Sequence, residues 1–250
     1  YTSVEMQKYK WISIFFIIIF FKNDLFNGYM DAILAIYTLI GLFILSLICI
    51  NLKDLNENLT ILGLTIFVIT NLKDEGMVIS SIIMFLFLFF IVKNFKLLLK
   101  NKFFYIFLFI VITSFIYNLS WKYFVYNSNN LAFFGENKIN NIKFNYGDIL
   151  LILDFLIIQS NLIFYFVSLI LIFLLNIMSK SKKIITEFSL LIIIFSVLYF
   201  LVITLVYLIS PLDTSWHLHS SANRVLDTIK FSIMFCILIN LMKNYGNKYF

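Results

Sequence analysis

Long apolar runs recur along the whole chain, separated by short polar segments. About 20 mostly apolar residues are enough to carry an α-helix across a bilayer. The runs are apolar on every side and lack the two-residue alternation of a membrane β-strand. The pattern therefore predicts an all-α, polytopic transmembrane helical bundle of about eight spans. The predicted spans are residues 11–21, 31–51, 58–72, 76–92, 103–120, 160–178, 186–209 and 229–243.

Three of these runs, 11–21, 58–72 and 229–243, are short for a full crossing. Tilting, extension by flanking polar residues and a partly re-entrant path all stay open for them. Ahead of the span that starts at 160, residues 147–158 hold two acidic side chains on a mostly apolar background. This pattern predicts a short interfacial helix that lies at the membrane surface.

The chain opens on Tyr1, and its first apolar run is not followed by the small-residue cleavage site of a signal peptide. No internal repeat or heptad pattern divides the sequence. We therefore expect residues 1–250 to form a single transmembrane domain. We also expect this domain to be the C-terminal part of a longer protein, whose first spans and first outer loop precede Tyr1.

The composition agrees with a membrane protein. Of the 250 residues, 62% are apolar and 13% are charged, whereas soluble domains carry about 25% charged residues. A water-soluble core of this size has no room for 31 Phe and the long Ile and Leu runs. Cys49 and Cys236 lie inside apolar runs, which predicts lipid-buried thiols rather than a disulfide or a metal site.

The net charge of +6 is a topology signal and predicts no nucleic-acid binding, because the lysines lie in short segments between spans. With the N-terminus of the chain inside, the predicted inner segments hold 12 of the 19 basic residues, as the positive-inside rule requires. Trp11, Trp121 and Trp216 fall at span ends, where amphipathic rings prefer to lie. Abundant Ile, Phe, Asn and Lys indicate an AT-rich bacterial genome. We therefore expect a bacterial inner (cytoplasmic) membrane, with the basic loops cytoplasmic.

Two polar stretches on the predicted outer side contain candidate site residues, since ionisable groups at a membrane edge are costly and tend to mark function. Residues 27–31 end in Asp31, which also fits an ordinary helix start. Residues 71–76 put three consecutive charges, including Lys73 and Glu75, into one tight turn. A solvated turn between two helices remains the alternative.

The third outer stretch, 210–224, contains the only Pro, both His and the only Arg of the chain. Arg224 predicts a two-pronged contact with phosphate or carboxylate, and an arginine that reaches to the lipid headgroups is the alternative. His217 and His219 lack a third His or a Cys nearby, so we expect no metal site. No Gly-rich phosphate loop or dinucleotide fingerprint occurs, and no cofactor is implied.

The string from Asp213 to Leu226, DTSWHLHSSANRVL, resembles a motif of bacterial integral-membrane type-C glycosyltransferases. In that family a D-x-x-W-H-L-x-x-S-x-x-R-x-L pattern precedes a late span. Its members depend on polyprenyl-phosphate sugars and are related to protein mannosyltransferases and aminoarabinose transferases. Three shorter matches keep the family's order. They are Gly28–Asp31, Lys73–Gly76, where Asp74 replaces the Asn often found in the family, and Trp121–Tyr123.

The resemblance covers roughly residues 25–235 and implies an enzyme that moves a sugar from a polyprenyl-phosphate donor to a lipid, glycan or protein acceptor at the outer face. It implies Lys73 and Arg224 on the donor phosphate, where fixed cations stabilise the departing group. The catalytic base of the family is usually an acidic residue on the first outer loop, so we expect it upstream of Tyr1. The expected substrate-binding residues are Asp31, Lys73, Glu75, Trp216, His217, His219 and Arg224.

The expected partners are membrane lipid and the polyprenyl-phosphate sugar, and the pattern sets no oligomeric state. Two other functions stay open. A transporter or flippase for lipid-linked glycans is expected to place ionisable residues in the middle of its spans and to use broken helices near the midplane. A non-catalytic membrane subunit of a larger complex is the other alternative.

Overall fold

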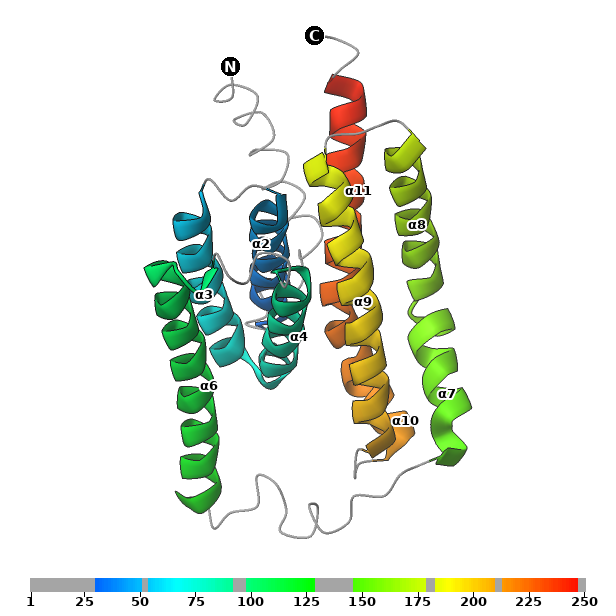
Figure 1. Cartoon of the computed structure of the whole chain (residues 1–250). Helices are drawn as coiled ribbons and strands as arrows, with labels where there is room; N and C mark the ends of the chain where they lie inside the picture. Colours follow the sequence, from blue (N-terminus) through cyan, green and yellow to red (C-terminus); the bar gives the residue numbers. More distant parts are fainter. Residues whose placement is uncertain are drawn as a thin grey trace.

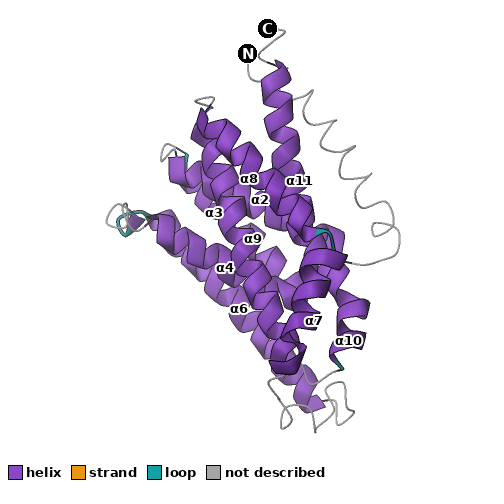
Figure 2. Cartoon of the chain, turned by 90° about the vertical axis from the view of Figure 1, so that its right-hand side faces the viewer, coloured by secondary structure: helices purple, strands orange, loops and turns teal. Residues whose placement is uncertain are grey.

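The computed structural model describes residues 30–50, 54–91, 98–128, 146–178, 183–209 and 213–246. The predicted span 11–21 lies outside the described residues, as do residues 129–145. Every element of the described part is a helix, which confirms the all-α class (Figures 1 and 2).

In chain order, the helices are α2 (Asp31–Ile50), α3 (Leu55–Leu72), α4 (Asp74–Ile91), α6 (Lys102–Ser128), the 3-10 turn η2 (Tyr146–Asp148), α7 (Ile149–Leu153), the π-helical η3 (Asp154–Gln159), α8 (Leu162–Met178), α9 (Lys183–Ile209), α10 (Thr214–His217), the π-helical η4 (Leu218–Ala222) and α11 (Asn223–Gly246).

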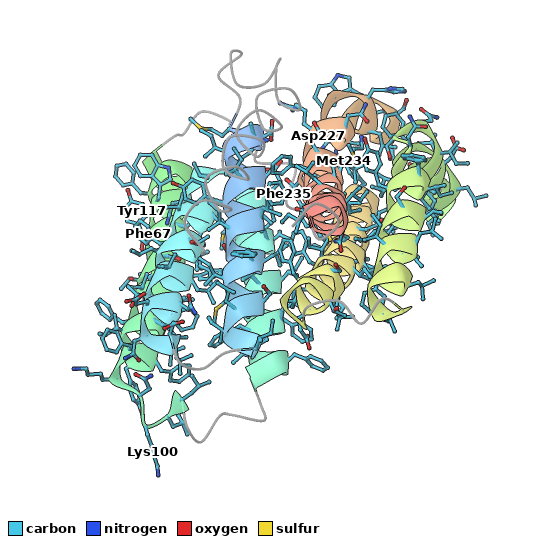
Figure 3. The ribbon with its side chains drawn as sticks, turned by 90° about the horizontal axis from the view of Figure 1, so that it is seen from above. Phe67, Lys100, Tyr117, Asp227, Met234 and Phe235 are labelled. Atoms are coloured by element: carbon cyan, nitrogen blue, oxygen red, sulfur yellow. The ribbon has the colours of Figure 1, made fainter. Side chains whose placement is uncertain are left out.

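Successive long helices run in opposite directions, so their ends gather at two poles (Figure 1). The α3–α4 turn, the end of α6, the start of α7 and α10 share the lower pole of Figure 1, which we call the site pole. Helix α6 starts at the pole opposite the site pole (Figure 1), and Lys100, just ahead of α6, projects away from the helices (Figure 3). Helices α2 and α4 contact α9, and α2 also contacts α11, which joins the two sides of the bundle. The described parts of the segments predicted to lie outside therefore share one end of the bundle (Figure 1).

Four described helices are long and apolar enough to cross a membrane: Asp31–Ile50, Leu55–Leu72, Lys102–Phe124 and Thr186–Ile209. A bent pair of helices raises the number to five if it counts as one span. For the described residues, the prediction of about eight spans is therefore too high. Helices α4 and α11 both carry charged residues in their first turns and do not belong to this set. The run 58–72, predicted as a short span, is part of the 18-residue α3.

The short helix predicted ahead of the span at 160 is present and is bent against the helix that follows it. Residues Ile149–Gln159 continue into Leu162–Leu174 with a bend of 61°, and the two pieces together are long enough for a broken span or a re-entrant loop. The place of this helix at the membrane surface stays a prediction. The bend falls at Asn161, whose φ of 58° is left-handed, a conformation that Asn tolerates better than most residues. Asp154 Oδ2 accepts a hydrogen bond from Gln159 Nε2 at 3.0 Å.

The apolar side chains divide into a buried core and an exposed outer surface. Phe87, Phe107 and Phe195 are fully buried between the helices. In contrast, only 22% of the apolar window Lys102–Phe124 is buried, and Phe67 and Tyr117 point away from the bundle (Figure 3). Apolar surface of this extent is not stable in water. The outer faces of these helices are therefore suited to lipid.

The α3–α4 turn depends on a glycine. A Cβ built on Gly76 would lie 1.9 Å from the Ile69 carbonyl oxygen and 2.9 Å from the Ile69 carbonyl carbon. Both atoms belong to the backbone of α3, so they cannot turn aside as a flexible side chain can. Gly76 therefore allows α4 to start directly against the last turns of α3, and this close approach holds the charged turn in place.

We predict that Gly76→Ala lowers the free energy of unfolding by about 1–3 kcal/mol, the usual cost of overpacking. The added methyl group must push α3 and α4 apart. Thermal unfolding of the protein in detergent, followed by circular dichroism, measures the effect. Gly147→Ala is the matched control, because a Cβ at Gly147 meets nothing within 4 Å. Equal unfolding temperatures for the two variants would contradict the close approach.

Candidate functional site

Lys73 is the one non-helical residue between α3 and α4, and its backbone is extended (φ −160°, ψ 163°). The Gly76 N–H donates to the Lys73 carbonyl at 3.0 Å. The Lys73 ammonium donates to Asp31 Oδ1 at the start of α2 and lies 3.6 Å from Glu75 Oε1. We call Asp31, Lys73 and Glu75 the Lys73 cluster. It joins two polar stretches that lie about 40 residues apart in the sequence.

Asp31 is the buried member of the cluster, with 5% of its side chain exposed, against 28% for Lys73 and 30% for Glu75. A carboxylate removed from water costs several kcal/mol unless a cation pairs with it. Lys73 supplies that cation and uses one of its three N–H donors on Asp31. No described residue hydrogen-bonds to Asp31 Oδ2. The cluster has two carboxylates and one ammonium, so it keeps one negative charge.

The third polar stretch is a helix start rather than the loop that the sequence predicts. Helices α10, η4 and α11 follow one another without a break from Thr214 to Gly246. Asp213 caps this helix, because its Oδ1 accepts from the Trp216 N–H at 2.8 Å. The Thr214 hydroxyl donates to Asp148 Oδ2 at 2.5 Å, which fastens the helix start to the entrance of α7. Residues 210–212 lie outside the described residues.

Glu75, Tyr199, Tyr207 and His217 line one cavity of about 110 Å³ between α4, α9 and α10, which we call the Glu75 cavity. Tyr199 Oη and His217 Nδ1 are buried and have no hydrogen-bond partner among the described residues. Buried polar atoms of folded proteins almost always have a partner. The rest of the lining is Val78, Val202, Ile203, Val206, Ser221 and Val225.

His217 is neutral at pH 7 in this environment. Burial lowers its pKa from 6.5, and the Glu75 carboxylate raises the same pKa by a smaller amount. The imidazole ring meets the ring of Tyr207 edge-on, with 4.7 Å between the ring centroids. A neutral imidazole presents one nitrogen as a donor and the other as an acceptor. His217 can therefore accept a proton from a group that enters the cavity.

The Tyr207 hydroxyl is oriented by a short chain of hydrogen bonds. Ser221 Oγ donates to the His217 carbonyl at 2.8 Å and lies 2.9 Å from Tyr207 Oη. Because a serine hydroxyl has one hydrogen, Tyr207 is the donor in the second pair. The lone pairs of Tyr207 Oη then remain available to a ligand.

An open groove of about 680 Å³ lies beside the cavity, between α4, α6 and α9; we call it the lipid-side groove. Asp74 and Lys122 form an ion pair at 2.8 Å within its lining. Val78 and Val202 line both the groove and the Glu75 cavity. The remaining lining residues are Met77, Ser81, Ile82, Phe85 and Leu198.

The predicted site residues divide into those at the cavity and those away from it. Glu75 and His217 line the cavity, and the Arg224 guanidinium acts electrostatically on Tyr207. His219 is exposed and meets the ring of Phe155 edge-on at 4.9 Å, so it does not line the cavity. Trp216 is 61% exposed. Among the described residues, no group of three His, Cys, Asp or Glu is placed to hold a metal ion.

Sequence reasoning missed Tyr199 and Tyr207, because both lie in an apolar run that was interpreted only as a membrane span. A signal was present: the two tyrosines are eight residues apart, close to two helical turns, with Ile203 between them in an otherwise mostly aliphatic segment. Ser221 belongs to the third polar stretch but was not selected. Lys122 was quoted as part of a short match, and its pairing with Asp74 is visible only in three dimensions.

Comparison with known proteins gives no relative from which a function could be transferred: no family model matches the chain, and no curated protein or solved structure matches it significantly.

We predict that Lys73→Met destabilises the protein by on the order of 3 kcal/mol, because it leaves the buried Asp31 carboxylate without its cation. Adding Asp31→Asn to this variant removes the unpaired carboxylate charge and is expected to restore much of the lost stability. Chemical unfolding of the single and double variants in mixed micelles measures both effects.

Lys122→Met is the matched control, since it breaks the ion pair with Asp74, whose partners are 41% and 71% exposed. Exposed pairs contribute less than about 1 kcal/mol. If Lys73→Met costs no more than Lys122→Met, the Asp31–Lys73 pair is not the buried contact described here.

Proposed function

We propose that this chain is part of a bacterial inner-membrane glycosyltransferase that moves a sugar from a polyprenyl-phosphate donor to a lipid, glycan or protein acceptor. The site pole would face the outside, with the basic segments in the cytoplasm. The observation that carries the proposal is the convergence of three separate motifs. Asp31, Lys73, Glu75 and His217 come from all three polar stretches and gather around one ion-pair cluster and its adjoining cavity.

The cations at this pole suit a departing phosphate. Cleavage of the bond between sugar and phosphate leaves negative charge on the polyprenyl phosphate, which fixed positive groups stabilise. Lys73 is partly exposed and, among the described residues, donates one hydrogen bond of a possible three. Arg224 is close enough to influence Tyr207 of the cavity. Lys73 therefore keeps two donors for a phosphate beside Glu75, and Arg224 adds a second positive charge whose field reaches the cavity.

The lipid-side groove suits the polyprenyl chain of the donor. Its lining is mostly aliphatic or aromatic, and it shares Val78 and Val202 with the cavity. A single amphiphile can therefore keep its apolar chain in the groove and its polar head beside the cavity, while the cavity itself stays free for another group. The side-by-side arrangement of a cavity lined partly by polar residues and a mostly apolar groove suits such a donor.

We predict that Arg224→Lys lowers the rate of sugar transfer at least about 100-fold, since a lysine cannot make the two-pronged phosphate contact. Purified full-length protein in proteoliposomes, supplied with a radiolabelled polyprenyl-phosphate sugar, gives the measurement. Lys100→Met, which removes a cation at the opposite pole, is the control and is expected to transfer at the wild-type rate. Undiminished transfer by Arg224→Lys would contradict the proposed role.

The same assay distinguishes a glycosyltransferase from a flippase and from a non-catalytic subunit. A flippase would move the lipid-linked sugar between leaflets without joining it to an acceptor. A non-catalytic subunit would show neither reaction, while a complex that contains it would remain active after the motifs at the site pole are changed. Either result would overturn the glycosyltransferase proposal.

We also predict that Ser81→Trp, which fills the lipid-side groove, raises the KM for a long-chain donor at least about tenfold. A donor with one or two isoprene units should be affected much less, because its chain does not reach far into the groove. Ser168→Trp is the matched control. Ser81 and Ser168 each donate to the carbonyl four residues earlier at 2.8 Å, but Ser168 lies on α8, outside the groove. Equal effects on short and long donors would contradict this use of the groove.

A further inference from the structure

Two residues that line the Glu75 cavity, Tyr199 and His217, carry buried polar atoms to which no described residue hydrogen-bonds. Tyr199 is 1% exposed, and its hydroxyl has no hydrogen-bond partner among the described residues. His217 Nδ1 is likewise buried without one. Leaving such a group unsatisfied costs about 1–3 kcal/mol. Two such atoms in one cavity indicate that a polar group from outside completes the site.

The volume of the cavity limits what this group can be. At about 110 Å³, the cavity has room for about three water molecules at the roughly 30 Å³ each occupies in the liquid. A hydroxyl group with the carbons next to it fits, whereas a polyprenyl chain does not. The valine and isoleucine side chains of α9 restrict polar contacts to Glu75, the two tyrosines, Ser221 and His217. The cavity therefore has the size and the polar lining to take one small hydroxylated group.

The electrostatic surroundings of His217 come from every element around the cavity. Glu75 of α4 carries a negative charge, and Lys73 beside it compensates part of that charge. Tyr207 of α9 contacts the imidazole ring, and the positive charge of Arg224 of α11 acts on Tyr207. Burial keeps the imidazole neutral at pH 7 because it lowers the pKa of His217. Glu75 opposes that shift, since a carboxylate nearby favours the protonated ring.

We propose that the Glu75 cavity receives the hydroxyl group of the acceptor and that His217 takes the proton of this hydroxyl, while Glu75 stabilises the imidazolium that forms. The inference rests on the proposed function and assigns the base to this chain, whereas the motif resemblance places it upstream of Tyr1. It makes His217 a catalytic residue and Glu75 a positioning residue.

The proposed step moves one proton to His217 and one electron pair to the polyprenyl phosphate. The acceptor O–H bond breaks, and its proton goes to the ring of His217. The acceptor oxygen forms a bond to the anomeric carbon of the sugar. The bond from that carbon to the phosphate oxygen breaks, and its electron pair leaves with the polyprenyl phosphate. The charge on the imidazolium is offset by Glu75, and the charge on the phosphate by Lys73 and Arg224.

The first test is the pH dependence of sugar transfer by the full-length protein. Wild-type kcat is expected to fall on the acid side, with a midpoint below pH 6.5, as His217 becomes protonated. His217→Gln is expected to lower kcat by about 10²–10⁴-fold, with the KM for the donor within twofold, and to lose this acid limb. Glu75→Gln is expected to shift the acid limb to lower pH, because loss of the carboxylate lowers the pKa of His217 further.

His219→Gln is the matched control, as it removes the neighbouring histidine that faces Phe155 and not the cavity. Its acid limb is expected to match that of the wild type. If His217→Gln keeps the wild-type acid limb and rate, His217 is not the base, although transfer by the wild type would still support the glycosyltransferase. If the wild type transfers no sugar from any polyprenyl-phosphate donor, both proposals are overturned.

A second test does not depend on activity. The chain has two histidines, so the NMR spectrum of histidine-labelled protein in micelles is simple, and His219→Gln assigns the remaining signal to His217. This signal is expected to titrate below pH 6.5 and at a still lower pH in Glu75→Gln. If Glu75→Gln does not shift the pH at which the His217 signal titrates, Glu75 does not act on His217, and the proposed pairing is overturned.

Discussion

The site pole depends on one buried ion pair, the contact between Asp31 at the start of α2 and Lys73 in the α3–α4 turn. A carboxylate with 5% of its side chain exposed cannot stay charged at that depth unless a cation reaches it. The pair therefore fixes the start of α2 against the turn. Because Glu75 is two residues from Lys73, the same contact also sets the direction in which Glu75 enters its cavity.

The α3–α4 turn can make this contact because it is nearly free of loop residues. Lys73 alone separates the two helices, and Gly76 lets the backbone of α4 pass the Ile69 carbonyl at a distance that no side chain permits. The short turn leaves little conformational freedom for three adjacent charges. Gly76 therefore does two things at once. It lets α4 follow α3 closely without a clash, and in doing so it holds the three adjacent charges in place.

Much of the site could be predicted from the sequence, and the reasons for the failures are physical. Asp31, Lys73, Glu75 and His217 stood out because charged and imidazole groups are rare in so apolar a chain. Tyr199 was overlooked because a tyrosine in an aliphatic run has the same pattern as a lipid-facing aromatic residue, and only packing against α4 and α10 turns it inward. His219 was selected with His217 because they are two residues apart. On a helix, that spacing points them in different directions, and the structure sends one to the cavity and the other to Phe155.

Among the described residues, the number of spans was overestimated for a related reason. Apolarity in a sequence does not distinguish a helix that faces lipid from one that is surrounded by other helices, and α11 carries Arg224, Asp227 and Lys230 in its first two turns. Val78 and Val202, two of the least conspicuous residues of the chain, form the common wall of the Glu75 cavity and the lipid-side groove. The packing of α4 against α9 therefore separates the partly polar cavity from the apolar groove. A substrate that is polar at one end and apolar at the other is the kind of molecule that this wall can hold in one orientation.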